Sequence, residues 1–301
     1  MSLFETVSTY GRMIRFSHSV FALPFAFSGA ALAAAQGGIS VEQIAWIVVA
    51  MVGARSAAMG FNRLADRQYD ADNPRTAQRE LPSGLVSPLA VVLFVFISSA
   101  ALVVAAWQLN SLCLYLSPFV LAVLFFYSLT KRFTWASHLV LGLSLGGAPL
   151  GAWIAVTGSF ALPPFLLCAA VLTWVAGFDI IYSCQDRDYD VDVGLHSIPA
   201  RFGVQRALHI ARVMHVASVL VMVVLGWHVA LGAFYWFGVL AIATLLIWEH
   251  RLVRPDDLAR VNMAFLNLNA VISVVYFVCT LADLVFFGEG KPLLIWPENN
   301  P

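Results

Sequence analysis

Long apolar stretches alternate with short polar links along the whole chain. A helix needs about 20 mostly apolar residues to cross a bilayer, and nine stretches of the sequence approach that length. We predict spans at roughly 17–36, 41–61, 87–108, 111–128, 136–157, 162–184, 207–227, 230–249 and 262–287. Several links are only a few residues long, which favours antiparallel neighbours in one helical bundle. The pattern predicts an all-α integral membrane protein with a single domain over residues 1–301.

The basic residues lie on one side of the predicted spans. Of the 17 Lys and Arg residues, only Lys291 follows the last span, and the links after the first, third, fifth and seventh spans contain none. The others precede the first span, as Arg12 and Arg15 do, or lie in or beside the even-numbered links. Because basic loops stay cytoplasmic, we expect a cytoplasmic N-terminus. The alternation supports nine spans, since one missed span would scramble it.

The composition agrees with a chain that is solvated mostly by lipid. Hydrophobic residues make up 60% of the sequence and charged residues 11%, against about 45–50% and 25% in an average soluble domain. These values exclude a disordered protein and a nucleic-acid-binding protein with a basic face. The four cysteines form no CxxC pair, so we expect neither a zinc site nor a disulfide framework.

A polar link at 62–87 carries an acidic cluster where an apolar helix is expected to end. Asn62, Asp66 and Asp70 are spaced four residues apart and form the first Asp motif. At about 100° per residue, this spacing places all three on one helix face. Placing an ionisable side chain within the membrane costs free energy, so such residues are candidates for function.

A second acidic cluster repeats the arrangement about 120 residues later. Asp179, Asp186 and Asp190 are spaced i, i+7 and i+11, again close to one helix face, and form the second Asp motif. Asp179 lies inside the apolar run VAGFDIIYSC, where a solvated surface acid is not expected. Two bare carboxylate rows at one depth would repel, and oxygen ligands of this kind suit a Mg²⁺ ion that also bridges to phosphate. The alternative is a set of interfacial acids paired with arginines.

Basic residues near the motifs are candidates for holding a diphosphate. Arg79, in NPRTAQRELPSG, and Lys131, in YSLTKRF, are the best placed, and Tyr127 lies one helical turn before Lys131. Alternatively, Arg79 and Lys131 only reflect the excess of basic residues in cytoplasmic links, and Tyr127 is one of the tyrosines that are common at the membrane interface. Arg55 lies on the face of the first Asp motif but deeper, where a guanidinium needs a bidentate anion. Its partner is Asp179, another protein carboxylate, or a carboxylate on a substrate.

Two segments, NRLADRQYD and DIIYSCQDRDYDVDVGLHSIPARFG, resemble the paired aspartate motifs of the membrane-embedded aromatic prenyltransferases, the UbiA superfamily. The segments NPRTAQRELPSG and YSLTKRFTWASHLVLG match in type and order, so the resemblance covers nearly the whole chain. The amino-acid sequence of the second motif is most similar to that of the 4-hydroxybenzoate polyprenyltransferase branch. One departure is Arg63, which stands where the first motif often carries a second acid and makes that site less anionic.

The resemblance implies Mg²⁺-dependent transfer of a polyprenyl group from polyprenyl diphosphate to an aromatic acid. The acceptor is 4-hydroxybenzoate, at the carbon ortho to its hydroxyl, in ubiquinone or menaquinone biosynthesis. An alternative acceptor is 1,4-dihydroxy-6-naphthoate of the futalosine menaquinone pathway. The resemblance also implies nine helices around a central cavity, in a bacterial-type inner membrane, with the active site toward the cytoplasm. The partners are then the two substrates and membrane lipid, with no nucleic acid and no obligate protein partner.

Carried over residue by residue, the resemblance gives most polar candidates a role. Asn62, Asp66 and Asp70 hold one Mg²⁺–diphosphate contact, and Asp186 and Asp190 hold the other with help from Asp179. Arg79, Lys131 and Tyr127 contact the diphosphate, and Arg55 holds the aromatic carboxylate. Aromatic faces at a similar depth are weaker candidates to stabilise an allylic cation, with core packing as the alternative: Phe21, Phe25, Phe61, Phe178 and Tyr182.

Two other interpretations remain open at this point. A secondary transporter would also have many spans and intramembrane charge, but it would carry broken or charged helices near the bilayer midplane. Another transferase of the same superfamily, making haem O, a chlorophyll-type product or a tocopherol precursor, would share the Asp motifs. The seven histidines show no H-x-x-x-H pair, and we interpret all of them as structural or interfacial.

Overall fold

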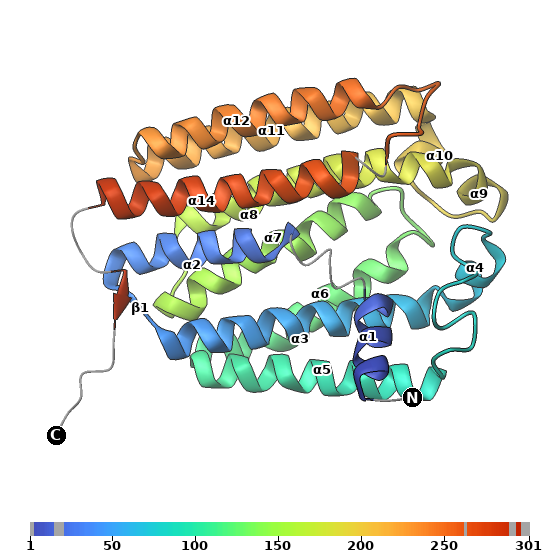
Figure 1. The fold of residues 1–301 in the computed structure, drawn as a ribbon, viewed down its shortest axis with the longest axis horizontal. Coiled ribbons are helices and arrows are strands. Elements are labelled where there is room, and N and C mark those ends of the chain that lie inside the picture. Colours follow the sequence, from blue (N-terminus) through green and yellow to red (C-terminus); the bar gives the residue numbers. More distant parts are fainter. Residues whose placement is uncertain (1–2, 15–20, 262–263, 289–292, 296–301) are drawn as a thin grey trace. The chain divides into compact units, whose positions relative to one another are not determined.

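The computed structural model consists almost entirely of α-helices, which Figure 1 labels in chain order. The residues that the structure describes are 3–14, 21–261, 264–288 and 293–295. The cations Arg15 and Lys291 and the start of the first predicted span therefore lie outside the described residues. The chain divides into two compact units, Met1–Ser19 with Trp46–Leu129 and Val20–Ala45 with Thr130–Pro301.

The first unit combines three long helices with two short ones. These are α3 (Val41–Ala65, from Trp46 onward), α5 (Pro88–Leu109), α6 (Ser111–Thr130, up to Leu129), α1 (Leu3–Met13) and α4 (Arg67–Asp72). Helix α5 begins at a proline after a serine cap, because Ser87 Oγ accepts a hydrogen bond from the Ala90 N–H at 3.2 Å. Gly53 lets α3 approach α5, since a Cβ there would lie 2.8 Å from the Ser98 carbonyl oxygen. This packing fixes the helix that carries the first Asp motif.

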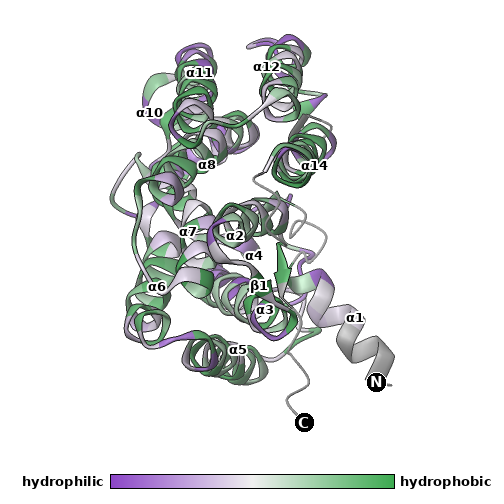
Figure 2. Cartoon of the chain, turned by 90° about the vertical axis from the view of Figure 1, so that its left-hand side faces the viewer, coloured by the Kyte–Doolittle hydropathy of each residue, from purple (hydrophilic) through white to green (hydrophobic). Residues whose placement is uncertain are grey.

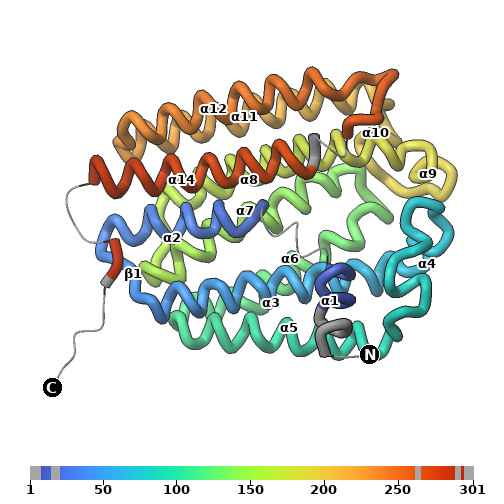
Figure 3. Tube along the Cα trace, in the orientation of Figure 1, coloured from blue at the N-terminus to red at the C-terminus, as the bar shows by residue number. Residues whose placement is uncertain are grey.

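Six helices of the second unit pack in a closed ring. They are α2 (Leu23–Gly37), α7 (Ser137–Thr157), α8 (Leu162–Ser183), α11 (Val204–Val229), α12 (Ala233–Leu252) and α14 (Asn269–Phe287). Around the ring, α7 packs on α8, α8 on α11, α11 on α12, α12 on α14, α14 on α2, and α2 on α7. Figure 3 traces these helices from one side. The ring is filled, because the Phe25 ring lies 5.0 Å from the rings of both Trp174 and Tyr276. Helix α8 of this ring leads into the second Asp motif.

Short elements connect the long helices of the second unit. They are the 3₁₀ turn η2 (Cys184–Asp186), α9 (Arg187–Asp192), α10 (Ile198–Phe202), the π-helical turn η3 (Ala264–Leu268) and the parallel strand pair β1 (Ile39–Ser40) and β2 (Leu294–Ile295). They are too short to show a hydrophobic period, and the sequence analysis did not predict them. Helix α10 still has a cap, since Ser197 Oγ accepts a hydrogen bond from the Ala200 N–H at 3.3 Å.

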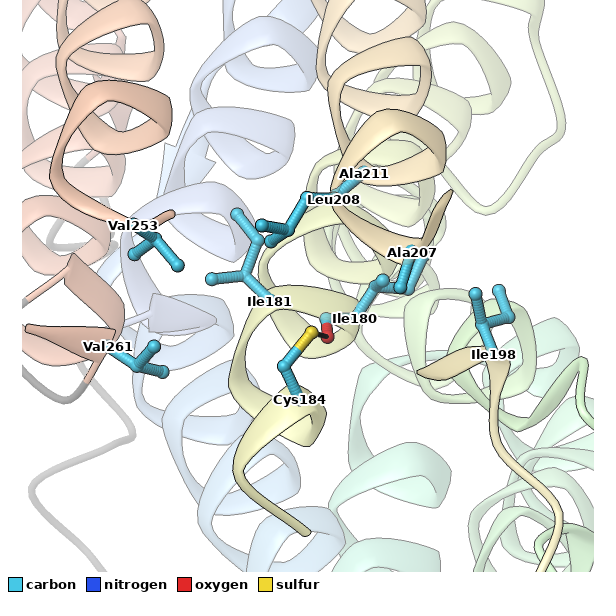
Figure 4. Packing of buried hydrophobic residues seen from close by; sticks show 9 residues of the cluster. All are labelled: Ile180, Ile181, Cys184, Ile198, Ala207, Leu208, Ala211, Val253 and Val261. Atoms are coloured by element: carbon cyan, nitrogen blue, oxygen red, sulfur yellow. Dashed lines mark hydrogen bonds between the residues drawn. The ribbon is translucent and has the colours of Figure 1, made fainter. Parts of the chain in front are cut away.

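A hydrophobic cluster packs around the end of α8, as Figure 4 shows. Its members come from α8, η2, α10, α11 and the segment after α12, and all are buried: Ile180, Ile181, Cys184, Ile198, Ala207, Leu208, Ala211, Val253 and Val261. Burying a large aliphatic side chain contributes about 1.5–3 kcal/mol. The cluster therefore anchors the chain immediately before Asp186.

Eight helices among the described residues are long and apolar enough to span a membrane. Figure 2 shows hydrophobic residues along most of each long helix, and large apolar side chains face outward, including Phe96 at 72% and Trp227 at 79% exposure. Soluble proteins rarely expose contiguous apolar surface on this scale. The predicted all-α integral membrane fold is confirmed.

The predicted spans agree with the observed helices to within a few residues. The first predicted span corresponds to α2, which has 15 residues. The total of nine spans and the cytoplasmic N-terminus stay predictions.

Candidate active site

The first Asp motif lies where α3 ends and α4 begins. Asn62 Nδ2 donates a hydrogen bond to Asp66 Oδ2 at 2.9 Å. The helix is interrupted at Asp66, since α3 ends at Ala65 and Asp66 has φ −92° and ψ 8°. Aspartate favours caps and turns over helix interiors, which accounts for the break. Backbone bonds from Asp66 N–H to Asn62 O and from Asp70 N–H to Asp66 O continue across it, so the three residues still follow a helical path.

Asp70 is a buried carboxylate that faces two arginines. Its Oδ1 lies 2.6 Å from Arg79 Nη1, and its Oδ2 lies 3.9 Å from Arg63 Nη1. Arg63 is also buried and donates from Nε to the Met13 carbonyl at 3.0 Å. A buried carboxylate needs such partners, because desolvation penalises an isolated charge. Arg79 was expected near this motif, whereas the contact of Arg63 was not predicted. In the sequence, its one indication was the position of a basic residue next to Asn62.

The second Asp motif is interrupted in the same way. Helix α8 ends at Ser183, Asp186 closes the 3₁₀ turn with φ −99° and ψ 3°, and Asp190 lies in α9. Asp179 lies in α8, whereas Asp186 and Asp190 lie beyond its end, and a shared face for the three side chains stays a prediction. Asp190 is buried, and its Oδ2 lies 3.6 Å from Lys131 Nζ. Lys131, selected for diphosphate binding, thus lies beside this motif.

A five-residue sequence, D-R-x-Y-D, occurs at both breaks, over 66–70 and 186–190. In each copy the first aspartate leaves the helix, and the arginine begins a helix of 6 residues. In each copy the last aspartate is buried beside a basic side chain. This pentapeptide is the sequence signal from which both breaks could have been located.

Asp179 has a partner that the sequence analysis did not identify. His138, in the first turn of α7, places Nδ1 2.6 Å from Asp179 Oδ2. The other ring nitrogen of His138, Nε2, accepts a hydrogen bond from the Ile198 N–H at 3.3 Å. The interpretation of every histidine as structural or interfacial overlooked this contact with a candidate site residue. Packing of α7 on α8 joins the two residues across 41 positions of sequence.

The aromatic candidates lie in packed surroundings. The Phe178 ring is 5.0 Å from that of Trp174 and 5.9 Å from that of Phe21, and Phe178 is buried. Tyr182 is half-buried and packs against the hydrophobic cluster of Figure 4. This placement favours the core-packing alternative, and a role in stabilising an allylic cation stays a prediction for both.

Arg55 and Tyr127 both lie half-buried in long helices. Arg55 belongs to α3, about two turns deeper than Asn62, and Tyr127 lies in the last turn of α6. Their assigned contacts, with an aromatic carboxylate and a diphosphate respectively, stay predictions.

The carboxylates suit a divalent cation that is shared with a phosphate. Asp70 Oδ2 and Asp190 Oδ2 are buried and accept no hydrogen bond from the described residues. Leaving a buried acceptor without a hydrogen bond is costly. Across the described part of the chain, no three His, Cys, Asp or Glu side chains gather into a metal-binding group. Carboxylate oxygens are the kind of ligand that suits Mg²⁺, which usually takes one or two carboxylates and completes its shell with waters and substrate phosphates.

The comparison with known proteins shows where this arrangement belongs. Residues 22–271 match the UbiA prenyltransferase family, and this range includes both D-R-x-Y-D turns. The chain belongs to that family. It is therefore an enzyme that transfers prenyl groups, and the transporter alternative is set aside.

Two named relatives are similar in sequence to this UbiA chain. A protein of Tolumonas auensis named 4-hydroxybenzoate octaprenyltransferase is 34% identical over 217 residues, which cover 72% of this chain and 76% of that protein. A protein of the same name from Sodalis glossinidius is 32% identical over 257 residues, covering 83% and 87%.

Solved UbiA structures share the fold. The apo structure of a UbiA homologue from Aeropyrum pernix K1 has a TM-score of 0.81 and 36% identity, and the match covers 89% of this chain and 98% of that one. A UbiA homologue from Archaeoglobus fulgidus bound to DMAPP and Mg²⁺ has a TM-score of 0.69 and 16% identity, covering 92% and 99%. The second likeness is one of fold alone.

Proposed function

We propose that this UbiA enzyme transfers a polyprenyl group from polyprenyl diphosphate to 4-hydroxybenzoate, at the carbon ortho to the hydroxyl. The observation that carries the proposal is the pair of D-R-x-Y-D turns, each of which buries an aspartate against a basic side chain. The relatives named 4-hydroxybenzoate octaprenyltransferase support this acceptor. The reaction serves ubiquinone or menaquinone biosynthesis at a bacterial inner membrane, with the active site toward the cytoplasm.

The aspartates of each motif ligate Mg²⁺ in this proposal. Asn62, Asp66 and Asp70 supply the oxygens of the first motif, and Asp186 and Asp190 those of the second. When bound, the ion acts as a Lewis acid that neutralises charge developing on the leaving diphosphate. The chain's own contribution is to hold these oxygens in place through the packing around each turn.

Arg79, Lys131 and Tyr127 bind the diphosphate in this proposal. Arg79 and Lys131 already face Asp70 and Asp190, so their charged ends lie beside the carboxylates. A guanidinium and an ammonium suit the phosphate oxygens, Arg through its fork of donors and Lys as a point charge.

Arg55 holds the carboxylate of the aromatic acid in this proposal. A bidentate contact would fix the direction of the ring. Fixing the ring brings its electron-rich ortho carbon toward the allylic carbon of the donor, and such positioning supplies several kcal/mol. The new carbon–carbon bond forms as the carbon–oxygen bond to the diphosphate breaks, and the ring carbon then loses its proton.

A paired acceptor assay tests the proposal. The purified enzyme in bilayer discs is given Mg²⁺ and prenyl diphosphates of several lengths, with either 4-hydroxybenzoate or 1,4-dihydroxy-6-naphthoate. We expect a prenylated 4-hydroxybenzoate product that chelation by EDTA removes. Product with the naphthoate alone would overturn the acceptor and support the alternative pathway. Absence of product with both acids would overturn the proposed function.

A further inference from the structure

His138 is held at both of its ring nitrogens. Its side chain has no exposed surface, while 21% of the Asp179 side chain remains exposed. The Nδ1 atom lies 2.6 Å from Asp179 Oδ2, and the Nε2 atom lies 3.3 Å from the Ile198 backbone nitrogen. The imidazole is therefore fully buried, while part of the Asp179 side chain stays accessible.

The two contacts define which nitrogen carries the proton. A backbone N–H can only donate, so Nε2 must accept the hydrogen bond from Ile198 and cannot carry a proton. In a neutral imidazole the proton then belongs to Nδ1, which donates to the Asp179 carboxylate. The backbone of α10 thus selects the tautomer that supports Asp179.

The segment between Asp190 and Ile198 is tied to the same place. The Leu195 N–H donates to the Asp190 carbonyl at 2.8 Å, and the His196 N–H donates to the Lys131 carbonyl at 2.7 Å. Lys131 Nζ lies 3.6 Å from Asp190 Oδ2. His138 therefore connects α7, the upstream aspartate of α8 and the segment that follows the second Asp motif.

We propose that His138 is a positioning residue for prenyl transfer, acting through its Nδ1–H bond to Asp179. This inference rests on the proposed function and assigns a role to a residue that the proposal does not use. The bond fixes the rotamer of the Asp179 carboxylate and keeps its accessible side directed away from His138. Partners that orient functional groups in this way typically change affinity or activity by about 10–100-fold when removed.

Three substitutions separate the two hydrogen bonds. The amide nitrogen of His138→Asn can replace Nδ1 and keep a donor to Asp179, whereas His138→Gln places its amide near Nε2 and His138→Leu removes both contacts. We expect kcat of His138→Asn to stay within about 3-fold of wild type, and kcat of the other two to fall about 10–100-fold. The KM for the aromatic acid should change little, because Asp179 is expected to assist the Mg²⁺–diphosphate contact of the second motif and not to bind the aromatic acid. The control His209→Leu, at an exposed position of α11, should match wild type.

Two kinetic outcomes would overturn the inference. One is wild-type kcat in folded His138→Leu, and the other is an equal loss of kcat in His138→Asn and His138→Gln. A ¹⁵N-histidine spectrum of the wild-type enzyme gives a measurement that does not depend on activity. The His138 resonance, identified by its loss in His138→Asn, should show protonated Nδ1, and protonated Nε2 would overturn the inference. A wild-type enzyme that makes no product with either acid would instead overturn the proposed function, while the spectrum would still test the tautomer.

Discussion

Asp70 and Asp190 are buried carboxylates with unequal partners. Arg79, which faces Asp70, is 20% exposed in its side chain, and Lys131, which faces Asp190, is 37% exposed. Solvent screens the more exposed pair more strongly. Removing the partner of a buried carboxylate leaves its charge uncompensated, and the cost is smaller where solvent already reaches the partner.

The two basic residues should therefore differ in their effect on stability. We expect Arg79→Gln to lower the free energy of unfolding by about 2–3 kcal/mol, at the low end for a broken buried pair. Lys131→Gln should cost less than about 1 kcal/mol. Unfolding in detergent, followed by circular dichroism, measures both, with exposed Arg75→Gln as the control. A larger loss for Lys131→Gln than for Arg79→Gln would contradict the argument.

Asp66 and Asp72 allow a matched test of the metal assignment. Asp66 stands at the break of the first motif in contact with Asn62, whereas Asp72 is exposed at the end of α4. Asp66→Ala should lower kcat/KM by about 100-fold or more, since a bound metal contributes several kcal/mol. Asp72→Ala should stay near wild type. Both variants should insert into membranes normally, and normal turnover by Asp66→Ala would exclude it as a metal ligand.

Arg55 should act on one substrate only. If it holds the aromatic carboxylate, Arg55→Ala raises the KM for the aromatic acid at least about 10-fold, the loss expected for a charge-assisted contact of about 1.5–3 kcal/mol. The KM for the prenyl diphosphate should change little. Steady-state kinetics with each substrate varied in turn give both values, and an equal rise in both would make Arg55 a structural residue.

Spacing predicts the polar residues of this site better than it predicts their contacts. The four-residue spacing of Asn62, Asp66 and Asp70 located the first motif, because such spacing marks one helix face. The bond between His138 and Asp179 could not be read in this way, since it joins residues on different helices. A lone histidine in an apolar helix gives no sign of which neighbour its ring will meet.

At the scale of helices, the close contact of α7 with α8 depends on glycine. A Cβ at Gly142 would collide with the backbone carbonyl of Leu172, whereas a Cβ at Gly147, on the same helix, would meet nothing within 4 Å. This packing also brings His138 to Asp179. Gly142 therefore sets the separation of the two helices that hold this pair.

Alanine substitutions at the two glycines should separate packing from helix propensity. Gly142→Ala should lower the free energy of unfolding by about 1–3 kcal/mol through overpacking. Gly147→Ala should be neutral or slightly stabilising, because alanine is the better helix former by about 1 kcal/mol. Thermal unfolding in detergent measures both. Equal effects would show that α7 and α8 can move apart without cost.

Apolar length predicts long helices well and short ones poorly. The spans expected at 87–108 and 162–184 are observed as Pro88–Leu109 and Leu162–Ser183. A buried or lipid-facing helix must stay apolar over its whole length, so its ends are visible where polar residues begin. Helices α4 and α9 have only 6 residues each and are rich in charge, so they leave no such trace. Their D-R-x-Y-D sequences mark them by repetition rather than by hydrophobicity.

At the scale of the whole molecule, charge placement and span number make one joint prediction. With a cytoplasmic N-terminus and nine spans, the last residue of the chain lies on the opposite side of the membrane. A reporter fused there should therefore behave as exported: alkaline phosphatase, which needs the oxidising periplasm to form its disulfides, should be active, and green fluorescent protein should be dark. Fusions after Thr134, in the link between α6 and α7 and four predicted spans from the N-terminus, should give the reverse pattern. A fluorescent fusion at the chain end, together with the expected result at Thr134, would mean an even number of spans after Thr134, where five are predicted, and would remove one of those five from the list of membrane helices. Active alkaline phosphatase after Thr134 would instead contradict the charge rule, because Lys131 and Arg132 would then lie in a periplasmic link.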